Sequence, residues 1–375
     1  MNNLLTPHFP SHDDPVAPLR LLEPDGMLSE GCTSPMDDEH VLRALRLMML
    51  SRAFDAKGIS LQRQGRFGTF SPVRGQEASV VGSAFALDAT RDWIVPQYRE
   101  LPALLHHGLP LERFILYFNG HPAGGHIPEG IRLLPIQISL AAQLPQAVGL
   151  AWGLQLQELD GVVLTYFGDG ASSEGDFHEA CNLAGVMKAP IVFFLQNNGW
   201  AISTPRSRQS AARTFAERAP GYGFNGIVVD GNDLLAVYAA TAAAVERARA
   251  GLGPTLIESQ TYRLGAHNTA DDPTRYVSQA VLDSWNDRDP IFRVQRYLTA
   301  RGFWSDDAAS EMHEDISKTI DRALVAARAV PPPTAEDLFK HTYAELTERQ
   351  ARQLREYTLS TTARTIGNDQ PHEHA

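Results

Sequence analysis

Four short apolar runs in the middle of the chain constrain its fold most strongly. They occupy residues 162–167, 191–196, 227–230 and 255–263, and helical spacing of apolar residues fills the intervening segments 177–188 and 234–250. Runs without polar alternation are typical of strands whose two faces are both covered. Strands separated by helices indicate right-handed crossovers and a parallel sheet. We therefore expect an α/β fold with a mostly parallel sheet and helices on both faces.

The flanking segments suggest three parts along the chain. We expect an extended arm over residues 1–33, a main α/β domain with a helical extension over 34–330, and a C-terminal helix with a polar tail over 331–375. Three consecutive prolines mark the last boundary, because proline cannot continue a helix. Further helices are predicted near 36–65, 75–87, 291–301, 306–329 and 343–358, with helical pattern from residue 281 and a short strand at 93–95.

Composition excludes several classes of protein. The chain has 375 residues, of which 43% are hydrophobic and 21% charged, so it can bury a sizeable core. No run of 18 apolar residues is long enough to span a membrane, and a net charge of −11 argues against nucleic acid as a partner. The first residues lack the apolar region of a signal peptide. With only Cys32 and Cys181, we expect a cytoplasmic protein in a reducing compartment, Cys181 being a core residue.

The first candidate site follows the run at 162–167. Asp169 lies between Gly168 and Gly170, at the point where a buried strand leads into a helix. In α/β sheets ligands bind at the carboxyl ends of strands, and glycines let backbone N–H groups approach a phosphate. A carboxylate aimed at a phosphate would repel it unless a cation lay between them, and oxygen ligands suit Mg²⁺. An ordinary turn is the alternative interpretation.

A second candidate follows the next run. Gln196-Asn197-Asn198-Gly199-Trp200 ends the strand predicted at 191–196. If the two strands are neighbours, Asn198 lies beside Asp169 and can give the same cation a second oxygen. Asparagine followed by glycine is also common in turns, but two such signals separated by one helix strengthen each other.

These motifs resemble a known family. Gly168-Asp169-Gly170 followed, after residues 171–196, by Asn197-Asn198 looks like the thiamine diphosphate motif. The wider sequence resembles the alpha subunit of the decarboxylating component of 2-oxo acid dehydrogenase complexes, over roughly residues 40–345. The likeness includes RGQEA (74–78), PQYREL (96–101), IPEG (127–130), VDGND (229–233), GPTLIE (253–258) and TYRLGAHNTADDPTRY (261–276).

The resemblance implies a role for individual residues, with the main domain as the half that binds metal and diphosphate. Asp169 and Asn198 resemble the side-chain ligands of Mg²⁺, with the carbonyl of Trp200 as a third ligand. The cofactor, thiamine diphosphate, would contact the following residues: Tyr98, Arg99, Ser139, Leu140, Gly168, Asp169, Gly170, Ala171, Asn198 and His267. Arg99 suits the diphosphate because charge-assisted bonds from arginine to phosphate are strong.

The resemblance also implies catalytic residues. His267 resembles the histidine near the reacting centre, where it would steady an intermediate or handle protons during acyl transfer. Arg263 would lie close to it. His121, in a glycine-rich segment that also contains His126, is a further candidate, and a flexible wall without chemistry is the equal alternative.

Two positions depart from the family pattern. Some relatives have arginine immediately before the paired asparagines, where this chain has Gln196, so diphosphate binding would depend more on Arg99, His267 and the metal. Relatives regulated by a kinase have serine directly after the loop histidine, where this chain has Asn268. Regulation by phosphorylation at that position is therefore in doubt.

The implied chemistry needs a partner. A glutamate must hydrogen-bond the aminopyrimidine ring, and in the family it comes from a beta subunit. Glu77 is better interpreted here as a capping and packing residue. We expect two alpha plus two beta chains, a 2-oxo acid substrate, and acyl transfer to the lipoyl group of an acyltransferase component. Pyruvate is slightly favoured. A branched-chain substrate such as 2-oxoisovalerate, and acetoin dehydrogenase, remain alternatives, and a non-catalytic nucleotide-binding scaffold ranks lowest.

Overall fold

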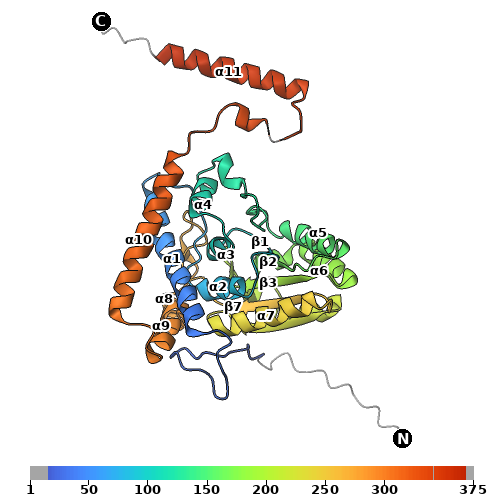
Figure 1. Ribbon diagram of the computed structural model, residues 1–375, viewed down its shortest axis with the longest axis vertical. Helices are drawn as coiled ribbons and strands as arrows, with labels where there is room; N and C mark the ends of the chain where they lie inside the picture. The colour runs from blue at the N-terminus through green and yellow to red at the C-terminus, as the bar shows by residue number, and fades with distance from the viewer. Residues whose placement is uncertain (1–15, 341, 369–375) are drawn as a thin grey trace.

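The protein folds around one five-stranded parallel sheet (Figure 1). A computed structural model describes residues 16–340 and 342–368. The strand order is β1-β2-β3-β7-β6, and every pairing within this sheet is parallel. The strands are β1 (Trp93–Val95), β2 (Val163–Gly168), β3 (Ile191–Asn197), β6 (Asn225–Asp230) and β7 (Thr255–Gln260). The fold class predicted from the apolar runs is confirmed.

The register of β2 and β3 brings the two sequence motifs together. Gly168 pairs with Gln196, so Asp169 and Asn198 each follow the last residues of neighbouring strands. β3 pairs in turn with β7, whose last residue, Gln260, lies opposite Asn197. The segments that follow β2, β3 and β7 therefore leave the same edge of the sheet.

Helices cover both faces of the sheet. Their bounds are α1 (Asp38–Arg63), α2 (Glu77–Phe85), α3 (Leu101–His106), α4 (Leu111–Phe118), α5 (Gln143–Leu156), α6 (Gly175–Met187), α7 (Leu234–Arg249), α8 (Gln279–Asn286), α9 (Pro290–Ala300), α10 (Asp306–Ala329) and α11 (Glu348–Asn368). A short antiparallel hairpin, β4 (Trp200–Ala201) with β5 (Thr204–Pro205), follows β3. The segment 101–156 contains α3, α4 and α5, which the sequence analysis did not assign.

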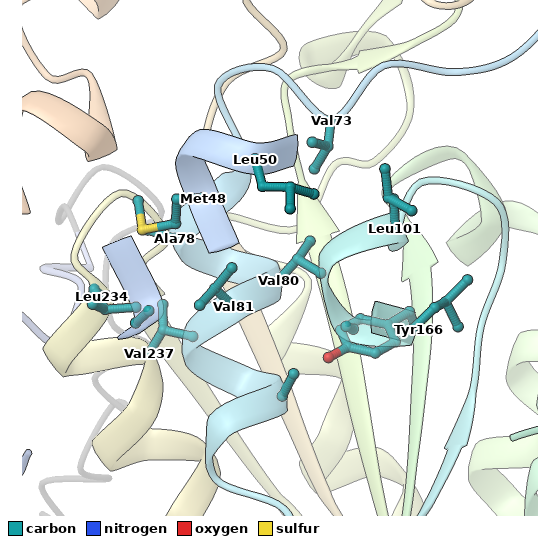
Figure 2. Close-up of a cluster of buried hydrophobic side chains, with 14 of the residues drawn as sticks. Met48, Leu50, Val73, Ala78, Val80, Val81, Leu101, Tyr166, Leu234 and Val237 are labelled. Carbon is teal, nitrogen blue, oxygen red and sulfur yellow. The ribbon is translucent and has the colours of Figure 1, made fainter. Parts of the chain in front are cut away.

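Alternate residues of β1, β2, β3 and β7 enter two separate hydrophobic cores. Leu164 and Tyr166 belong to the core formed with α1, α2 and α7, whereas Val163 and Phe167 belong to the core formed with α5 and α6. Figure 2 shows part of the first core, where apolar side chains of α1, α7 and the sheet gather around α2. Cys181, on α6, is fully buried in the second core, and burial raises the pKa of its thiol. Both faces of the sheet are therefore covered, as expected for strands that lack polar alternation.

The N-terminal arm is bound to the main domain through its described part. The described part of the N-terminal arm is tied to the sheet edge, because Leu19 bridges Val229 and the carboxylate of Asp233 accepts from the backbone N–H groups of Leu21 and Leu22. Residues 1–15 of that arm and 369–375 of the polar tail lie outside the described residues. Figure 1 shows α11 standing apart from the helices around the sheet.

The last helix begins later and ends later than predicted. It covers Glu348–Asn368 rather than 343–358. Thr347 explains its start: its hydroxyl accepts from the backbone N–H of Gln350, and the side chain of Gln350 accepts from the N–H of Thr347. This reciprocal pair is a capping box. No helix in the described segments is long and apolar enough to cross a membrane.

Gly75 lies where two loops beside the sheet edge approach each other closely. Its φ is +95°, and a Cβ there would lie 2.3 Å from the carbonyl oxygen of Tyr262. We expect Gly75→Ala to lower the free energy of unfolding by about 2 kcal/mol or more, because backbone strain adds to a steric clash. Denaturant titration measures this loss. Gly65→Ala is the control, since Gly65 also has positive φ but nothing within 4 Å; equal losses would show that the contact with Tyr262 costs nothing.

Candidate active site

A cavity of about 420 Å³ opens at the carboxyl edge of the sheet. It lies where the segments after β2, β3 and β7 meet those before α2 and α3. Among the residues predicted from the sequence, the following line it: Tyr98, Arg99, Leu140, Gly168, Asp169, Gly170, Ala171, Asn198, Trp200 and His267. The parallel register thus gathers into one cavity residues that lie up to 169 positions apart in the chain.

Asp169 is a buried carboxylate without a counter-ion. Its residue is 1% exposed, and among the described residues it forms no ion pair. Burial raises the pKa of Asp169 to about 6, although Gln209 donates a hydrogen bond to Oδ2 at 2.8 Å. An ionised carboxylate in such a place is costly unless a cation compensates it. The environment of Asp169 therefore suits a metal ion.

Asn198 and Trp200 line the same cavity as Asp169 and carry two further candidate oxygens. The amide nitrogen of Asn198 donates to Oε1 of Gln76 at 3.1 Å, and its Oδ1 accepts from the backbone N–H of Trp200 at 3.2 Å. No group of three His, Cys, Asp or Glu side chains in the described part of the chain could hold a metal. One carboxylate, one amide oxygen and one carbonyl remain as the candidate set, which is of the hard-oxygen type that Mg²⁺ prefers.

Two buried guanidinium groups lie near this carboxylate without anionic partners of their own. Arg99 is 6% exposed and donates to the backbone carbonyls of Pro72 and His267. Arg263, 2% exposed, donates to the carbonyl of Ile202 and the hydroxyl of Tyr276. Neither forms an ion pair with a carboxylate in the segments that the structure describes. Burial lowers the pKa of Arg99, but arginine remains protonated in proteins, so Arg99, which lines the cavity, is available to an anion.

His267 lies between the two arginines. Its Nδ1 is 3.3 Å from Nη2 of Arg99 and 3.4 Å from Nη1 of Arg263. Burial, followed by the two positive charges, lowers the pKa of His267 to about 4. The ring is therefore neutral at pH 7, and since Nδ1 faces two donors, its proton resides on Nε2. Asp271 fixes the loop by accepting from the N–H of His267 and the hydroxyl of Tyr276.

Three predicted residues do not line the cavity. Ser139 is exposed, although its neighbours Ile138 and Leu140 are lining residues. Arg263 lies outside the cavity wall but contacts two residues of it. Its Nη1 donates to the carbonyl of Trp200 at 3.4 Å and lies 3.4 Å from Nδ1 of His267. His121 caps a short 3-10 helix through the N–H of Ala123, and its Nε2 lies 2.9 Å from the carbonyl of Pro331.

Several polar side chains of the site were not predicted from the sequence. Gln76, Gln97 and Glu100 line the cavity, and Gln209 contacts Asp169. Gln76 and Gln97 each have a buried amide nitrogen without a hydrogen-bond partner, so two donors are unused there. Glu100 is buried and accepts from the amide of Gln196 at 2.6 Å. Gln196 is the residue that replaces arginine in the motif, and its amide is therefore engaged. Glu77, by contrast, accepts from Arg52 and the N–H of Gly75, as expected of a packing residue.

Burial of Asp169 predicts an unusual pH dependence of stability. The ordinary pKa of this carboxyl is 3.8 and its pKa in the folded chain is about 6. Between these values the unfolded chain has lost the proton that the folded chain retains, so the free energy of unfolding falls as pH rises. We expect cofactor-free protein to lose up to about 3 kcal/mol relative to Asp169→Asn between pH 3.5 and 7. Urea titrations across this range measure it; parallel curves for the two proteins would contradict the assigned environment.

The fold and the site together define an α/β protein whose cavity, at the carboxyl edge of the sheet, contains a buried carboxylate and a buried guanidinium. Comparison with known proteins gives the family. A family model described as "Dehydrogenase E1 component" matches residues 45–336. The chain is 43% identical over 341 residues to the pyruvate dehydrogenase E1 component subunit alpha of Staphylococcus epidermidis and to that of Bacillus cereus, covering 90% of this chain and 92% of each relative. The Bacillus subtilis protein of the same name is 42% identical over 339 residues, covering 90% and 91%.

These matches show that the chain belongs to the dehydrogenase E1 component family. The resemblance seen in the sequence is confirmed.

Proposed function

We propose that this chain is the alpha subunit of a pyruvate dehydrogenase E1 component. With a beta subunit it catalyses the thiamine-dependent oxidative decarboxylation of pyruvate and transfers the acyl group to the lipoyl arm of an acyltransferase. The observation that supports this most is the charge arrangement of the cavity: within the described residues, Asp169 pairs with no cationic side chain and Arg99 pairs with no carboxylate. A metal bound to a diphosphate satisfies both groups at once. Pyruvate is favoured because relatives covering 90% of the chain carry that name.

The residues present fit Mg²⁺ and thiamine diphosphate. Asp169, Asn198 and the Trp200 carbonyl would hold the metal, and Arg99 with Tyr98 and the N–H groups of Gly170 and Ala171 would hold the diphosphate. The unused amide donors of Gln76 and Gln97 support a polar ligand in the same cavity. When bound, the cofactor supplies the carbanion and the electron sink that decarboxylation needs.

The protein's own contribution centres on His267. Because Arg99 and Arg263 both face Nδ1, this nitrogen stays unprotonated and the ring presents its N–H at Nε2. A neutral imidazole held in one tautomer donates a hydrogen bond from Nε2 to a reacting oxygen without introducing a permanent charge. Phe70, Phe118 and Ile202 form apolar parts of the cavity wall and limit the access of water.

A beta subunit is required to complete this site. No glutamate in the part of the chain that the structure describes is placed as the activating partner of an aminopyrimidine: Glu77 is engaged with Arg52, and Glu100 with Gln196. The cavity wall also includes exposed apolar side chains, with Ile138 53% and Ile202 56% exposed. Exposed apolar side chains around a polar site are typical of an interface. The assembly we propose has two alpha and two beta chains in the cytoplasm.

A substrate panel tests the proposed function. The chain, co-purified with its beta subunit and supplied with thiamine diphosphate, Mg²⁺ and a lipoylated acceptor, should decarboxylate pyruvate faster than 2-oxoisovalerate. Faster turnover of 2-oxoisovalerate would assign the branched-chain activity instead, and preference for acetoin would assign the third class. Turnover of none of the three would overturn the proposal.

The loop that contains His267 should become protected when the cofactor binds. The segment 264–276 is held by hydrogen bonds between polar groups, such as those of Asp271, rather than by a buried apolar side chain. A bound diphosphate adds contacts to Arg99, whose Nη2 donates to the carbonyl of His267. Limited proteolysis should therefore cut between Leu264 and Tyr276 more slowly with thiamine diphosphate and Mg²⁺ than without them. Equal rates of cleavage in both conditions would count against a contact between the loop and the cofactor.

A further inference from the structure

Asp55 is a buried carboxylate behind the active site for which the proposed chemistry gives no use. It lies on α1, is 4% exposed, and forms no ion pair within the described segments. Its Oδ2 accepts two backbone hydrogen bonds, from Val73 at 2.8 Å and from Arg74 at 3.0 Å. Such a group is costly to bury, and a reason for its presence must come from its neighbours.

The neighbours form a chain of hydrogen bonds that ends at Arg99. The N–H that Val73 donates to Asp55 belongs to the same peptide unit as the carbonyl of Pro72, and that carbonyl accepts from Nη1 of Arg99 at 2.5 Å. One peptide group therefore lies between a carboxylate and a guanidinium. Hydrogen bonds in series polarise one another, so a carboxylate at the N–H end strengthens the carbonyl as an acceptor for Arg99.

We propose that Asp55 is a positioning residue that orients Arg99 for an anionic ligand through the Pro72–Val73 peptide. This inference rests on the proposed role of Arg99 as a diphosphate contact. A direct ion pair would have held Arg99 equally well but would have neutralised its charge. Holding it through a peptide fixes the guanidinium and leaves its charge available to the ligand.

The second buried carboxylate nearby does not serve the same purpose. Glu77 pairs with Arg52 at 2.7 Å, and Arg52 also pairs with Asp289 at 2.5 Å. The charge of Glu77 is therefore compensated locally. Burial, followed by the adjacent Glu77, raises the pKa of Asp55 well above its ordinary value, although the two N–H groups and Arg99 act in the opposite direction. The positive charge that Asp55 faces through the peptide is that of Arg99.

The test measures ligand affinity and stability in the same variants. Thiamine diphosphate, and separately inorganic pyrophosphate, would be titrated with Mg²⁺ into the assembly of this chain with its beta subunit, at pH 8 to favour ionised Asp55. Asp55→Asn keeps the shape of the side chain and removes its charge. We expect it to weaken binding of both probes about tenfold, the order of one charge-assisted hydrogen bond. The melting temperature should not fall in parallel, because a buried charge is also removed.

A double-mutant cycle separates this role from a general structural one. In an Arg99→Gln background, Asp55→Asn should have no further effect on affinity, because the residue through which it acts is gone. The matched control is Asp92→Asn: Asp92 is also buried and accepts from the backbone N–H groups of Val162 and Asp88, but it does not line the cavity. That variant should lose stability and keep its affinity within about twofold.

The outcomes distinguish this inference from the proposed function. Unchanged affinity in Asp55→Asn, with weakened binding in Arg99→Gln, would overturn the role of Asp55 and leave the function standing. Additive effects of the two substitutions would also overturn it. If the wild-type assembly bound neither probe, the proposed function itself would fail, and this inference with it. Should Asp55→Asn not fold, Asp55→Thr, which is close in volume, replaces it in the same cycle.

Discussion

Replacing Asp169 by alanine should abolish binding of Mg²⁺ and thiamine diphosphate and lower the rate of decarboxylation by at least about a thousandfold. Asp169 is the one ionisable side chain in the candidate metal set, and it lies 1% exposed at the end of β2. Without it, the candidate metal set loses its only charged ligand, and the metal that would separate the diphosphate from the remaining protein oxygens is no longer held. The bound cofactor is measured after gel filtration, and the rate with pyruvate and an artificial electron acceptor.

The fold of the Asp169→Ala protein should survive, because the substitution removes a buried charge and opens no core. Its circular dichroism and its assembly with the beta subunit serve as controls for this expectation. Gln209→Ala is a milder companion variant, since Gln209 only donates to Asp169 and to the carbonyl of Thr204. If Asp169→Ala kept the wild-type affinity for the cofactor, the assignment of Asp169 as a metal ligand would be wrong.

The purified chain alone should show no measurable decarboxylation of any 2-oxo acid, and adding the beta subunit should restore it. The physical reason is that the described residues include no free glutamate at the cavity, while Ile138 and Ile202 remain exposed at its wall. An obligate interface of this kind typically buries about 2,000 Å² or more. Steady-state rates of the lone chain, the lone beta subunit and the mixture measure the effect.

The purity of the lone chain decides how this result is interpreted. Mass spectrometry must show that no beta subunit is present, because a trace of complex would produce a false rate. Addition of Asp169→Ala chain in place of wild type is the matched control, since it should assemble and remain inactive. Turnover of pyruvate at a normal enzymic rate by the pure lone chain would show that the site is complete without a partner.

Much of this site follows from the positions of strands in the sequence. Asp169 and Asn198 could be predicted to lie close together because each follows an apolar run without polar alternation. Neighbouring parallel strands bring their carboxyl ends to the same edge of the sheet. Arg99 and His267 could be assigned only through resemblance to a family, because each follows a segment whose place in the sheet the sequence did not determine. The structure adds why they are suited: Arg99 is a buried guanidinium that pairs with no carboxylate among the described residues, and His267 lies against both Arg99 and Arg263.

Other features depend on long-range packing that local sequence does not record. Gln209 reaches Asp169 from an irregular segment forty residues later, where no periodicity marks it. Asp55 looks like an ordinary residue of α1 until the Pro72–Val73 peptide is seen between it and Arg99. The helices α3, α4 and α5 were missed because α3 and α4 are short and α5 contains a proline and two glycines, which blur the helical pattern.

One measurement tests the central claim most directly, that this cavity binds a diphosphate through a metal. Thiamine diphosphate would be titrated calorimetrically into the metal-free assembly of this chain with its beta subunit, once with Mg²⁺ and once with a chelator. We predict one bound cofactor for each copy of this chain in the presence of Mg²⁺ and no detectable binding without it. Equally tight binding in the chelator, or no binding in either condition, would contradict the account.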